Sequence, residues 1–306
     1  MADIIVFGQL ASTTIAKLEK LGRVYIFLHP TLFCPKDIYE NVKVLIFRSP
    51  FAINSELLKQ FPALQHVIRA GSGIESLDIE ALKRRGISFQ LIQADGTAVA
   101  ELAVGSLLSL IRHILPGSKS LIEGEWIKSQ LVGRQLNGST VVIVGFGCIG
   151  QSLAKILNGF GAHLIVCDRS PEVGDKLLTA SKYEVKFADI DNAIALGDYI
   201  FLCCPLTTET INLFDENRLS MMKSDSVLIN MARAQIVDTN ALIDALDSGR
   251  LGGACIDVFD MEPPTNFKLL KHSKVLATPH IGAQTREVQK SMESRIVQAV
   301  QQVIYV

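Results

Sequence analysis

The distribution of apolar and polar positions along the chain predicts an α/β fold. Short runs rich in Val, Ile and Leu recur from the start of the chain, and helix-length segments separate them. This pattern is typical of parallel strands joined by helical crossovers. In the first part of the chain, helices are expected at 55–61 and 79–85, and five strands are expected at residues 4–7, 24–27, 42–47, 64–70 and 87–92.

The second part of the chain predicts a larger sheet. Seven further strands are expected at residues 140–144, 164–168, 184–187, 199–203, 227–230, 254–258 and 275–277. A long apolar helix at 99–111 marks the junction, and a final helix at 284–303 is expected to return to the first domain. We therefore predict two doubly wound parallel-sheet domains, formed by residues 1–99 with 279–306 and by residues 100–278.

Composition and charge limit the class of protein. With 306 residues, of which 48% are hydrophobic and 20% charged, the chain suits two globular cores. The formal net charge is -1 and the basic residues are dispersed, which argues against nucleic acid or an anionic membrane as a partner. The longest apolar stretch is too short to cross a bilayer, and the strand at 4–7 leaves no room for an export signal. A cytoplasmic protein is therefore expected.

The six cysteines lie mostly within strand-like apolar runs. They form no Cys-x-x-Cys pair and show no spacing typical of metal ligands. We interpret them as reduced core residues and expect neither a disulfide nor a metal site.

A glycine-rich turn follows the strand at 140–144. Gly145, Gly147 and Gly150 form the pattern Gly-x-Gly-x-x-Gly, which opens a helical segment and precedes a second strand. The first glycine permits a tight turn, the second lets the backbone approach a pyrophosphate, and the third lets the helix pack on the sheet. Unpaired amides at the helix N-terminus would then meet the phosphate charge. This setting predicts a Rossmann-type dinucleotide site; the alternative is a glycine turn that binds no nucleotide.

An acidic residue ends the second strand of this motif. Asp168 lies 18 residues beyond Gly150, close to the separation expected for a carboxylate that binds the adenosine ribose. Such a carboxylate repels a 2′-phosphate, so NAD is favoured over NADP. Arg169 has two alternative roles, because a guanidinium either stacks on adenine or partly neutralises a phosphate.

Four further strands end in polar residues, at the edge where open parallel sheets bind ligands. The segments at 203–207, 229–234, 256–264 and 277–283 contain Pro-Leu-Thr, Asn-x-Ala-Arg, Asp-Val-Phe with a glutamate before two prolines, and Pro-His-Ile-Gly. In order and spacing these motifs resemble the D-isomer-specific 2-hydroxyacid dehydrogenases. The resemblance covers nearly the whole chain. It implies an NAD-binding Rossmann domain inserted into a flavodoxin-like substrate-binding domain, and interconversion of a small D-2-hydroxy acid and its 2-keto acid.

The resemblance also implies roles for single residues. Arg233 would hold the substrate carboxylate and polarise the reacting oxygen. His280 would be the acid/base and Glu262 its partner, while Asp257 would lie near the nicotinamide carboxamide. The cofactor-binding residues expected from the glycine turn and the motifs together are Gly145, Gly147, Cys148, Ile149, Gly150, Asp168, Arg169, Cys204, Pro205, Thr210, Ala232, Asp257 and Gly282.

The chemistry independently requires these residue types. Reduction of a 2-keto acid needs a fixed cation, a proton donor, and a carboxylate that favours the charged form of that donor. Taken singly, each residue has an alternative, structural interpretation. Arg233 would then be a surface cation, and Asp257 and Glu262 would be helix-capping or solvated acids. Their joint occurrence in family order favours the catalytic interpretation. The other histidines match no motif and are interpreted as structural.

In the first domain, residues 69–75 follow a strand and resemble the family's Gly-x-Gly-x-Asp turn. The backbone amides of that turn bind the substrate carboxylate in the family, which makes Ser72 and Gly73 the candidates here. Glu75 stands where the family usually has Asp, and Ser76 where Asn is common.

Arg48 ends another strand of the first domain, and the segment at 47–49 resembles the phosphoglycerate-oxidising members of the family. It is a candidate for binding a second anionic group of the substrate, with an ordinary strand-end cation as the alternative. Next to Arg233, Ala234 and Gln235 replace the Gly-Gly that is common in the family.

Three functions remain open from the sequence. The first is a keto-acid reductase of the family. The second is a phosphoglycerate-type or phosphonate-type dehydrogenase, suggested by Arg48 and by Gly-Ala-Gln-Thr at 282–285. The third is a non-catalytic, NAD-sensing interaction protein of the same fold, against which the intact catalytic residues argue. The resemblance also implies a homodimer, with residues 99–112 and the Trp126 region as contacts.

Overall fold

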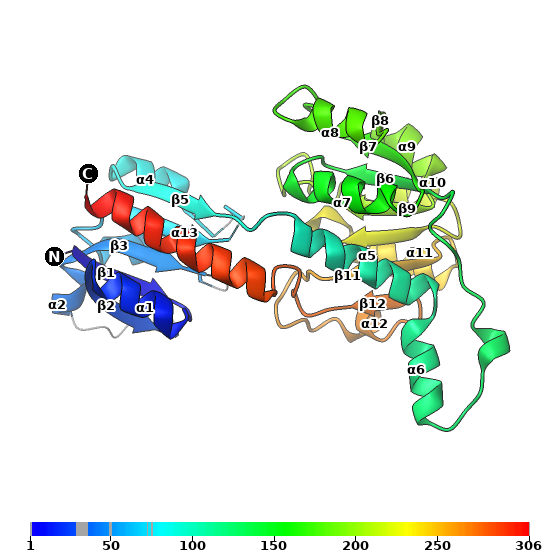
Figure 1. Ribbon diagram of the computed structural model, residues 1–306, viewed down its shortest axis with the longest axis horizontal. Helices are drawn as coiled ribbons and strands as arrows, with labels where there is room; N and C mark the ends of the chain where they lie inside the picture. The colour runs from blue at the N-terminus through cyan, green and yellow to red at the C-terminus, as the bar shows by residue number, and fades with distance from the viewer. Residues whose placement is uncertain (1, 29–35, 49–50, 72, 75, 306) are drawn as a thin grey trace. The chain divides into compact units, whose positions relative to one another are not determined.

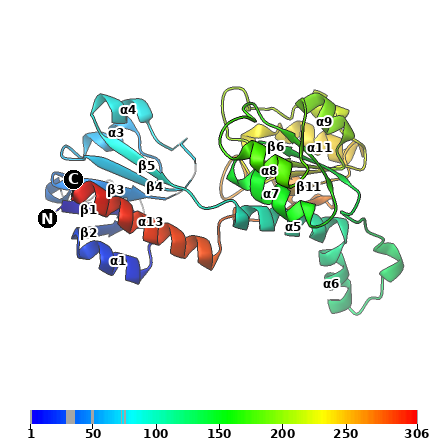
Figure 2. The ribbon, with the colours of Figure 1, turned by 45° about the horizontal axis from the view of Figure 1, so that its top comes forward.

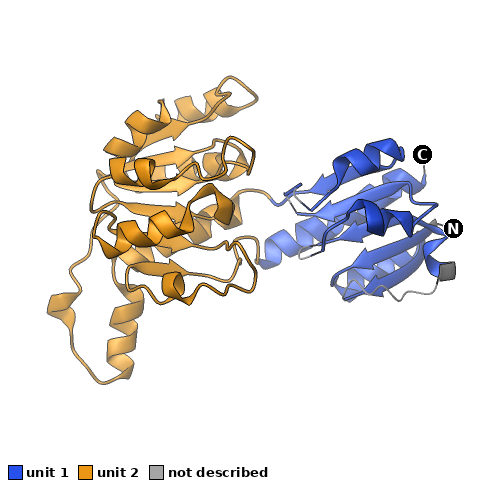
Figure 3. Cartoon of the chain, turned by 180° about the vertical axis from the view of Figure 1, so that it is seen from behind, with its two compact units in different colours: residues 1–94, 285–306 blue, residues 95–284 orange. Residues whose placement is uncertain are grey.

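The chain consists of two compact units, which Figure 3 shows in different colours. The structure is a computed structural model that describes residues 2–28, 36–48, 51–71, 73–74 and 76–305. Unit 1 is formed by residues 1–94 and 285–306, and unit 2 by residues 95–284. The first junction precedes the long apolar helix, because buried side chains of that helix such as Ala103 and Leu107 belong to the core of unit 2.

Unit 1 contains a five-stranded parallel sheet with the strand order β2-β1-β3-β4-β5. This is the flavodoxin-like order predicted for the first domain. Its elements are β1 (Ala2–Phe7), α1 (Ser12–Glu19), β2 (Gly22–Phe27), α2 (Lys36–Tyr39), β3 (Val42–Phe47), α3 (Ser55–Lys59), β4 (His66–Ala70), α4 (Ile79–Arg84), β5 (Ser88–Ile92) and α13 (Arg286–Ile304).

Helices cover both faces of the unit 1 sheet (Figure 2). The cluster on one face includes side chains of α2, α3 and α4, with Phe7, Phe47 and Phe61 fully buried against them. On the other face, α13 packs on β4, β5 and α1. Glu293 of α13 accepts hydrogen bonds from the amide of Ala11 at 3.1 Å and the hydroxyl of Thr14 at 2.7 Å. The final helix therefore returns to the first part of the chain, as its apolar spacing predicted.

Unit 2 contains a seven-stranded parallel sheet with the strand order β12-β11-β10-β9-β6-β7-β8. The order reverses between β6 and β9, which is the arrangement of the doubly wound dinucleotide-binding fold. The elements are α5 (Thr97–Ile111), α6 (Ile114–Ile122), η1 (Lys128–Gln130), β6 (Thr140–Val144), α7 (Cys148–Asn158), β7 (His163–Cys167), α8 (Lys176–Lys182), β8 (Lys186–Phe187), α9 (Ile190–Leu196), β9 (Tyr199–Leu202), α10 (Glu216–Met221), β10 (Val227–Asn230), η2 (Ala234–Ile236), α11 (Thr239–Asp247), β11 (Gly253–Ile256), α12 (Phe267–Leu270) and β12 (Val275–Ala277).

Two apolar clusters hold unit 2 together, one on each face of its sheet. Helices α5 and α7 bury one face, where Leu107 and Leu153 are fully inaccessible to solvent. Helices α9 to α12 bury the other face, around Ile194, Leu219 and Leu242. The strands between them are apolar on both sides, as expected for a parallel sheet covered by helices.

Three predicted strands of unit 2 are shorter than expected, and the one expected at 199–203 ends one residue early, at Leu202. The strand expected at 184–187 begins only at Lys186, because Glu184 adopts a left-handed backbone conformation with φ of 54° that ends the preceding turn. The strand expected at 254–258 ends at Ile256, because the side chain of Asp257 binds a neighbouring loop.

Helix α6 extends away from the rest of unit 2 (Figure 1). This helix and the segment after it expose several large apolar side chains, namely Leu115, Leu121, Ile122, Trp126 and Val132. Among the described residues, no single helix is long and apolar enough to span a membrane. Helices α5 and α6 together meet that criterion by length and composition only, and they bend by 60°.

Candidate functional site

The functional motifs of unit 2 follow strands whose last residues are paired in register across the sheet. One row of paired residues crosses six of the strands and consists of Cys167, Val144, Leu202, Asn230, Ile256 and Ala277. The residues that follow this row in the sequence include Gly145, Asp168, Asp257 and Thr278. Register alone therefore places the glycine turn and the polar strand ends along the same edge.

A cavity of about 510 Å³ lies at this edge, where the strand order reverses. Its lining includes seven of the predicted cofactor-binding residues: Gly145, Gly147, Asp168, Arg169, Cys204, Pro205 and Thr210. Burial raises the pKa of the Cys204 thiol to about 11, so this side chain is neutral there at physiological pH. Thr210 Oγ1 accepts a bond from the amide of Thr207 and donates one to the carbonyl of Pro205, both at 2.7 Å.

The glycine turn has the geometry that a dinucleotide requires. Gly145 has φ of 95°, and a Cβ atom there would lie 2.7 Å from the backbone nitrogen of Cys204. A Cβ on Gly150 would lie 2.3 Å from the carbonyl oxygen of Gly145. A Cβ on Gly147 would meet no atom within 4 Å, so the absence of a side chain there leaves open space in front of the helix. Cys148 and Ile149 form the first turn of α7, where helix amides lack intrahelical partners. The residues present therefore fit a pyrophosphate.

Asp168 is the most heavily bonded carboxylate of the cavity. It accepts hydrogen bonds from the amide of Phe146 at 2.7 Å, the amide of Ser170 at 2.9 Å and the ammonium of Lys176 at 2.6 Å. Burial raises the pKa of Asp168, but these bonds, with the largest contribution from Lys176, outweigh it and lower the pKa overall. The carboxylate is thus held in its charged form.

Three charged residues of the cavity were not identified from the sequence. Lys176 binds Asp168, Glu209 forms an ion pair with Arg169, and Asp189 caps helix α9. None of them belongs to a motif, and only the folding of the segments after β7, β8 and β9 brings them to the cavity. For Arg169, the observed partner is a carboxylate.

The second part of the edge holds Arg233. Asn230, which ends β10, is buried and uses its side chain to fold the following turn: Oδ1 accepts from the amide of Ala232 at 3.1 Å, and Nδ2 donates to the carbonyl of Arg233 at 2.9 Å. The guanidinium of Arg233 donates to the carbonyl of Ala232 at 2.7 Å, and the side chain is half-buried. Ala234 and Gln235 continue this turn as a short 3-10 helix.

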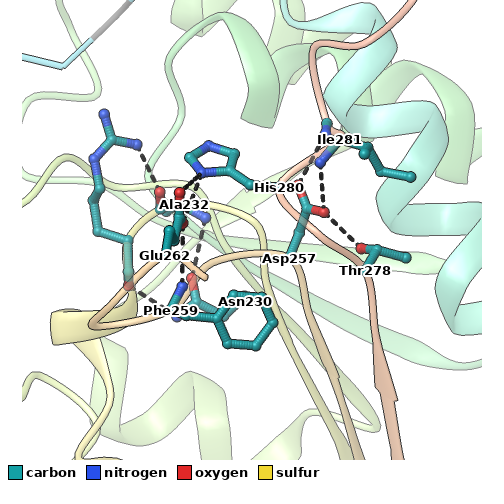
Figure 4. A network of polar contacts seen from close by, with 10 residues as sticks. Asn230, Ala232, Asp257, Phe259, Glu262, Thr278, His280 and Ile281 are labelled. Carbon is teal, nitrogen blue, oxygen red and sulfur yellow. Dashed lines mark hydrogen bonds and ion pairs between the residues drawn. The ribbon is translucent and has the colours of Figure 1, made fainter. Parts of the chain in front are cut away.

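His280 and Glu262 face each other on the loops after β12 and β11 (Figure 4). Nδ1 of His280 lies 2.8 Å and 2.9 Å from the two carboxylate oxygens of Glu262. The imidazole is 45% exposed and the carboxylate 41%, so the pair is open to a ligand. His280 adopts a left-handed backbone conformation with φ of 53°, which is uncommon for residues other than glycine.

Asp257 fixes the turn that carries His280 (Figure 4). Its buried carboxylate accepts hydrogen bonds from the hydroxyl of Thr278 at 2.6 Å and from the amides of Ile281 and Gly282, both at 2.9 Å. A Cβ on Gly282 would lie 3.2 Å from this carboxylate, so glycine suits the close approach. The contacts observed in unit 2 show that the Asp257 carboxylate holds the turn at 278–282, and its predicted contact with the cofactor stays a prediction.

Two of the predicted substrate residues of unit 1, Arg48 and Gly73, follow β3 and β4. Arg48 follows β3 next to Gly8, which follows β1, and the strand order of this sheet reverses at that point. Gly73 is buried, and its carbonyl accepts a hydrogen bond from the guanidinium of Arg69. Ser72 and Glu75 lie outside the described residues.

The comparison with known proteins decides the family. Residues 104–282 match the model of the D-isomer specific 2-hydroxyacid dehydrogenase, NAD binding domain. The chain belongs to this dehydrogenase family. A hydroxypyruvate reductase of Thermotoga maritima is 35% identical over 267 residues, which cover 86% of this chain and 85% of that protein.

Further relatives show the breadth of the family. A D-3-phosphoglycerate dehydrogenase of Methanocaldococcus jannaschii is 31% identical over 308 residues, which cover 99% of this chain but 58% of that longer protein. A solved D-lactate dehydrogenase of Aquifex aeolicus, complexed with NAD and lactic acid, has a TM-score of 0.88 at 24% identity and matches 98% of this chain and 95% of its own. The last comparison shows a shared fold.

The chain is thus an NAD-dependent D-2-hydroxyacid dehydrogenase. The fold, the family and the cofactor predicted from the sequence are confirmed. In the described part of the chain, no group of three or more His, Cys, Asp or Glu side chains is arranged to hold a metal ion.

Proposed function

We propose that this dehydrogenase reduces a small, unphosphorylated 2-keto acid, and that His280 donates the proton. The observation that carries the proposal is the imidazole of His280 on the carboxylate of Glu262, held on a turn that Asp257 fixes, at the same sheet edge as Arg233. Bound NADH supplies the hydride.

Each residue has a role that its contacts support. Because Nδ1 of His280 is directed at Glu262, Nε2 is the ring nitrogen left to give its proton to the substrate oxygen. Glu262 holds the ring of His280 through Nδ1 and so fixes its orientation toward the substrate. Arg233 binds the carboxylate of the keto acid and stabilises the negative charge that develops on the reacting oxygen. We assign Arg48, Ser72 and Gly73 to the substrate as well.

A phosphorylated substrate is the second candidate, and the position of Arg48 favours it. Arg48 lies where the strand order of the unit 1 sheet reverses, which is the usual ligand position in such sheets. The phosphoglycerate dehydrogenase named above is a relative of this chain, although the chain spans 58% of its length.

Hydroxypyruvate and phosphohydroxypyruvate separate the two candidates, because they differ only by the phosphate group. In assays of NADH oxidation, we expect kcat/KM for hydroxypyruvate to equal or exceed that for phosphohydroxypyruvate. The variant Arg48→Gln is a further control. If Arg48 binds a phosphate, the variant lowers kcat/KM for phosphohydroxypyruvate by about 10-fold or more and leaves hydroxypyruvate unchanged, since a charge-assisted bond contributes about 1.5–3 kcal/mol. That result, with a clear preference for the phosphorylated acid, would exclude the first candidate.

We also propose that a second copy of this chain covers the exposed apolar side chains of α6 and the segment after it. Ile122 is 84% and Trp126 79% exposed, and apolar patches of this kind are typical of protein interfaces. The apolar side of α5, in contrast, is used within unit 2. Light scattering should give twice the chain mass of 33.4 kDa. Ile122→Asp should shift the protein to the monomer, whereas Leu196→Asp, at an exposed leucine at the end of α9, should not. A monomeric wild type would contradict the proposal.

A further inference from the structure

The carboxylate of Asp168 is shared with a lysine of the same chain. Lys176 is the first residue of α8, and its ammonium lies 2.6 Å from Oδ1 of Asp168 and 3.0 Å from the carbonyl oxygen of Ser170. The two side chains are only 17% and 11% exposed. This is therefore a largely buried ion pair within the cavity of the glycine turn.

Three of the hydrogen-bonding positions of this carboxylate are occupied. A carboxylate offers about four lone-pair positions on its two oxygens. Oδ1 accepts bonds from Ser170 and Lys176, and Oδ2 accepts one from Phe146. Recognition of two ribose hydroxyls by Asp168 requires two positions. Lys176 thus competes with the second hydroxyl for the carboxylate.

The ammonium also changes the electrostatics of the ribose position. An unpaired carboxylate repels a phosphate on the 2′-hydroxyl, whereas Lys176 offsets the charge of Asp168 at contact distance. The free position lies on Oδ2, so a hydroxyl bonded there would share the carboxylate with Lys176, whose Nζ binds the other oxygen. A phosphate on such a hydroxyl would lie close to the ammonium and be attracted by it.

A second cation lines the same cavity. Arg169 is paired with Glu209, and both residues are about two-thirds exposed. Because this ion pair is open to solvent, the guanidinium can exchange its carboxylate partner for a phosphate at small cost.

We propose that Lys176 sets the cofactor preference of this enzyme. It weakens the discrimination that Asp168 imposes against a 2′-phosphorylated cofactor, so that the enzyme binds NADPH in addition to NADH. The inference rests on the cofactor role of this cavity. It assigns a specificity-determining role to a residue that lies outside the glycine motif.

Binding of NADH and NADPH, measured by titration calorimetry, tests the proposal. The proteins are the wild type, Lys176→Met, Lys176→Arg, and Lys182→Met as the matched control. Lys182 ends the same helix, with its ammonium 5.4 Å from the ring centroid of Tyr183. In Lys176→Met, the ratio of the Kd for NADPH to the Kd for NADH should rise about 10- to 100-fold, with NADH bound equally or more tightly. Lys176→Arg keeps the charge and should change the ratio much less, and Lys182→Met should not change it.

Two outcomes would overturn the proposal. One is a ratio that stays the same within twofold in Lys176→Met while this variant keeps the melting temperature of the wild type. The other is a wild type that binds NADH but no measurable NADPH. If Lys176→Met does not fold, Lys176→Arg provides the test. Because arginine keeps the positive charge, a 10- to 100-fold rise of the Kd ratio in this variant would contradict the role of the charge. The proposed function survives all of these, since it needs only NADH binding and turnover.

Discussion

Replacing His280 with asparagine should lower kcat by about 10²- to 10⁴-fold, the usual contribution of a general acid/base. Asparagine tolerates the left-handed conformation that His280 adopts, so the turn should persist while the proton donor is lost. Stopped-flow measurement of hydride transfer from NADH to the best keto acid gives the rate. The Kd for NADH should stay within about threefold of the wild type, since the glycine turn and Asp168 are intact.

His280→Ala provides the comparison, because alanine removes the imidazole and is also disfavoured at positive φ, by about 1–2 kcal/mol. Both variants should lose turnover, and only the alanine variant should lose thermal stability. His163→Ala is the matched control, since His163 is an exposed histidine at the opposite end of β7. An asparagine variant with kcat near that of the wild type would remove His280 from the mechanism. It would also reopen the interpretation of the chain as a non-catalytic NAD-sensing protein.

Replacing Arg233 with glutamine should lower kcat/KM for the keto acid by about 10³-fold, because the loss of one partner of a desolvated charge pair costs about 2–5 kcal/mol. The effect should appear in both KM and kcat, since the guanidinium is assigned to the carboxylate in the ground state and to the developing charge in the transition state. Steady-state kinetics at saturating NADH measures the two constants.

Arg233→Lys separates charge from shape. Lysine keeps the positive charge but not the planar pair of donors, so we expect it to recover only part of the lost activity. Arg250→Gln serves as control, because Arg250 is a surface residue of the same unit, with a 3.7 Å contact to Glu216. A glutamine variant that weakens NADH binding as much as it weakens catalysis would show that Arg233 supports the fold of the site rather than the substrate.

The sequence predicted the strands well because most of them are buried on both faces and therefore appear as short apolar runs. The exceptions have causes other than the apolar pattern. The edge strand β8 is only two residues long, since the positive φ of Glu184 is set by the turn before it and not by hydrophobicity. The end of β11 depends on the bonds of Asp257 to residues 278–282, which are distant in sequence.

The candidate site was predictable where a motif fixes it. The glycine turn follows β6 directly, and Arg233, Glu262 and His280 lie on the loops that follow β10, β11 and β12, so the register of the sheet brings all of them to one edge. Lys176 was missed because its contact with Asp168 depends on the path of the loop after β7, for which no pattern exists in the sequence. The pairing of Arg169 with Glu209 was missed for the same reason, since 40 residues separate the two.

The insertion of unit 2 between the two segments of unit 1 has a consequence for synthesis of the chain. The ribosome produces all of residues 95–284 before helix α13, which covers one face of the unit 1 sheet. Until α13 emerges, the apolar surface that Val288, Met292, Ile296 and Val300 later bury remains uncovered on the nascent protein. Unit 2 is contiguous and can fold first, so the larger domain is complete before the smaller one can close.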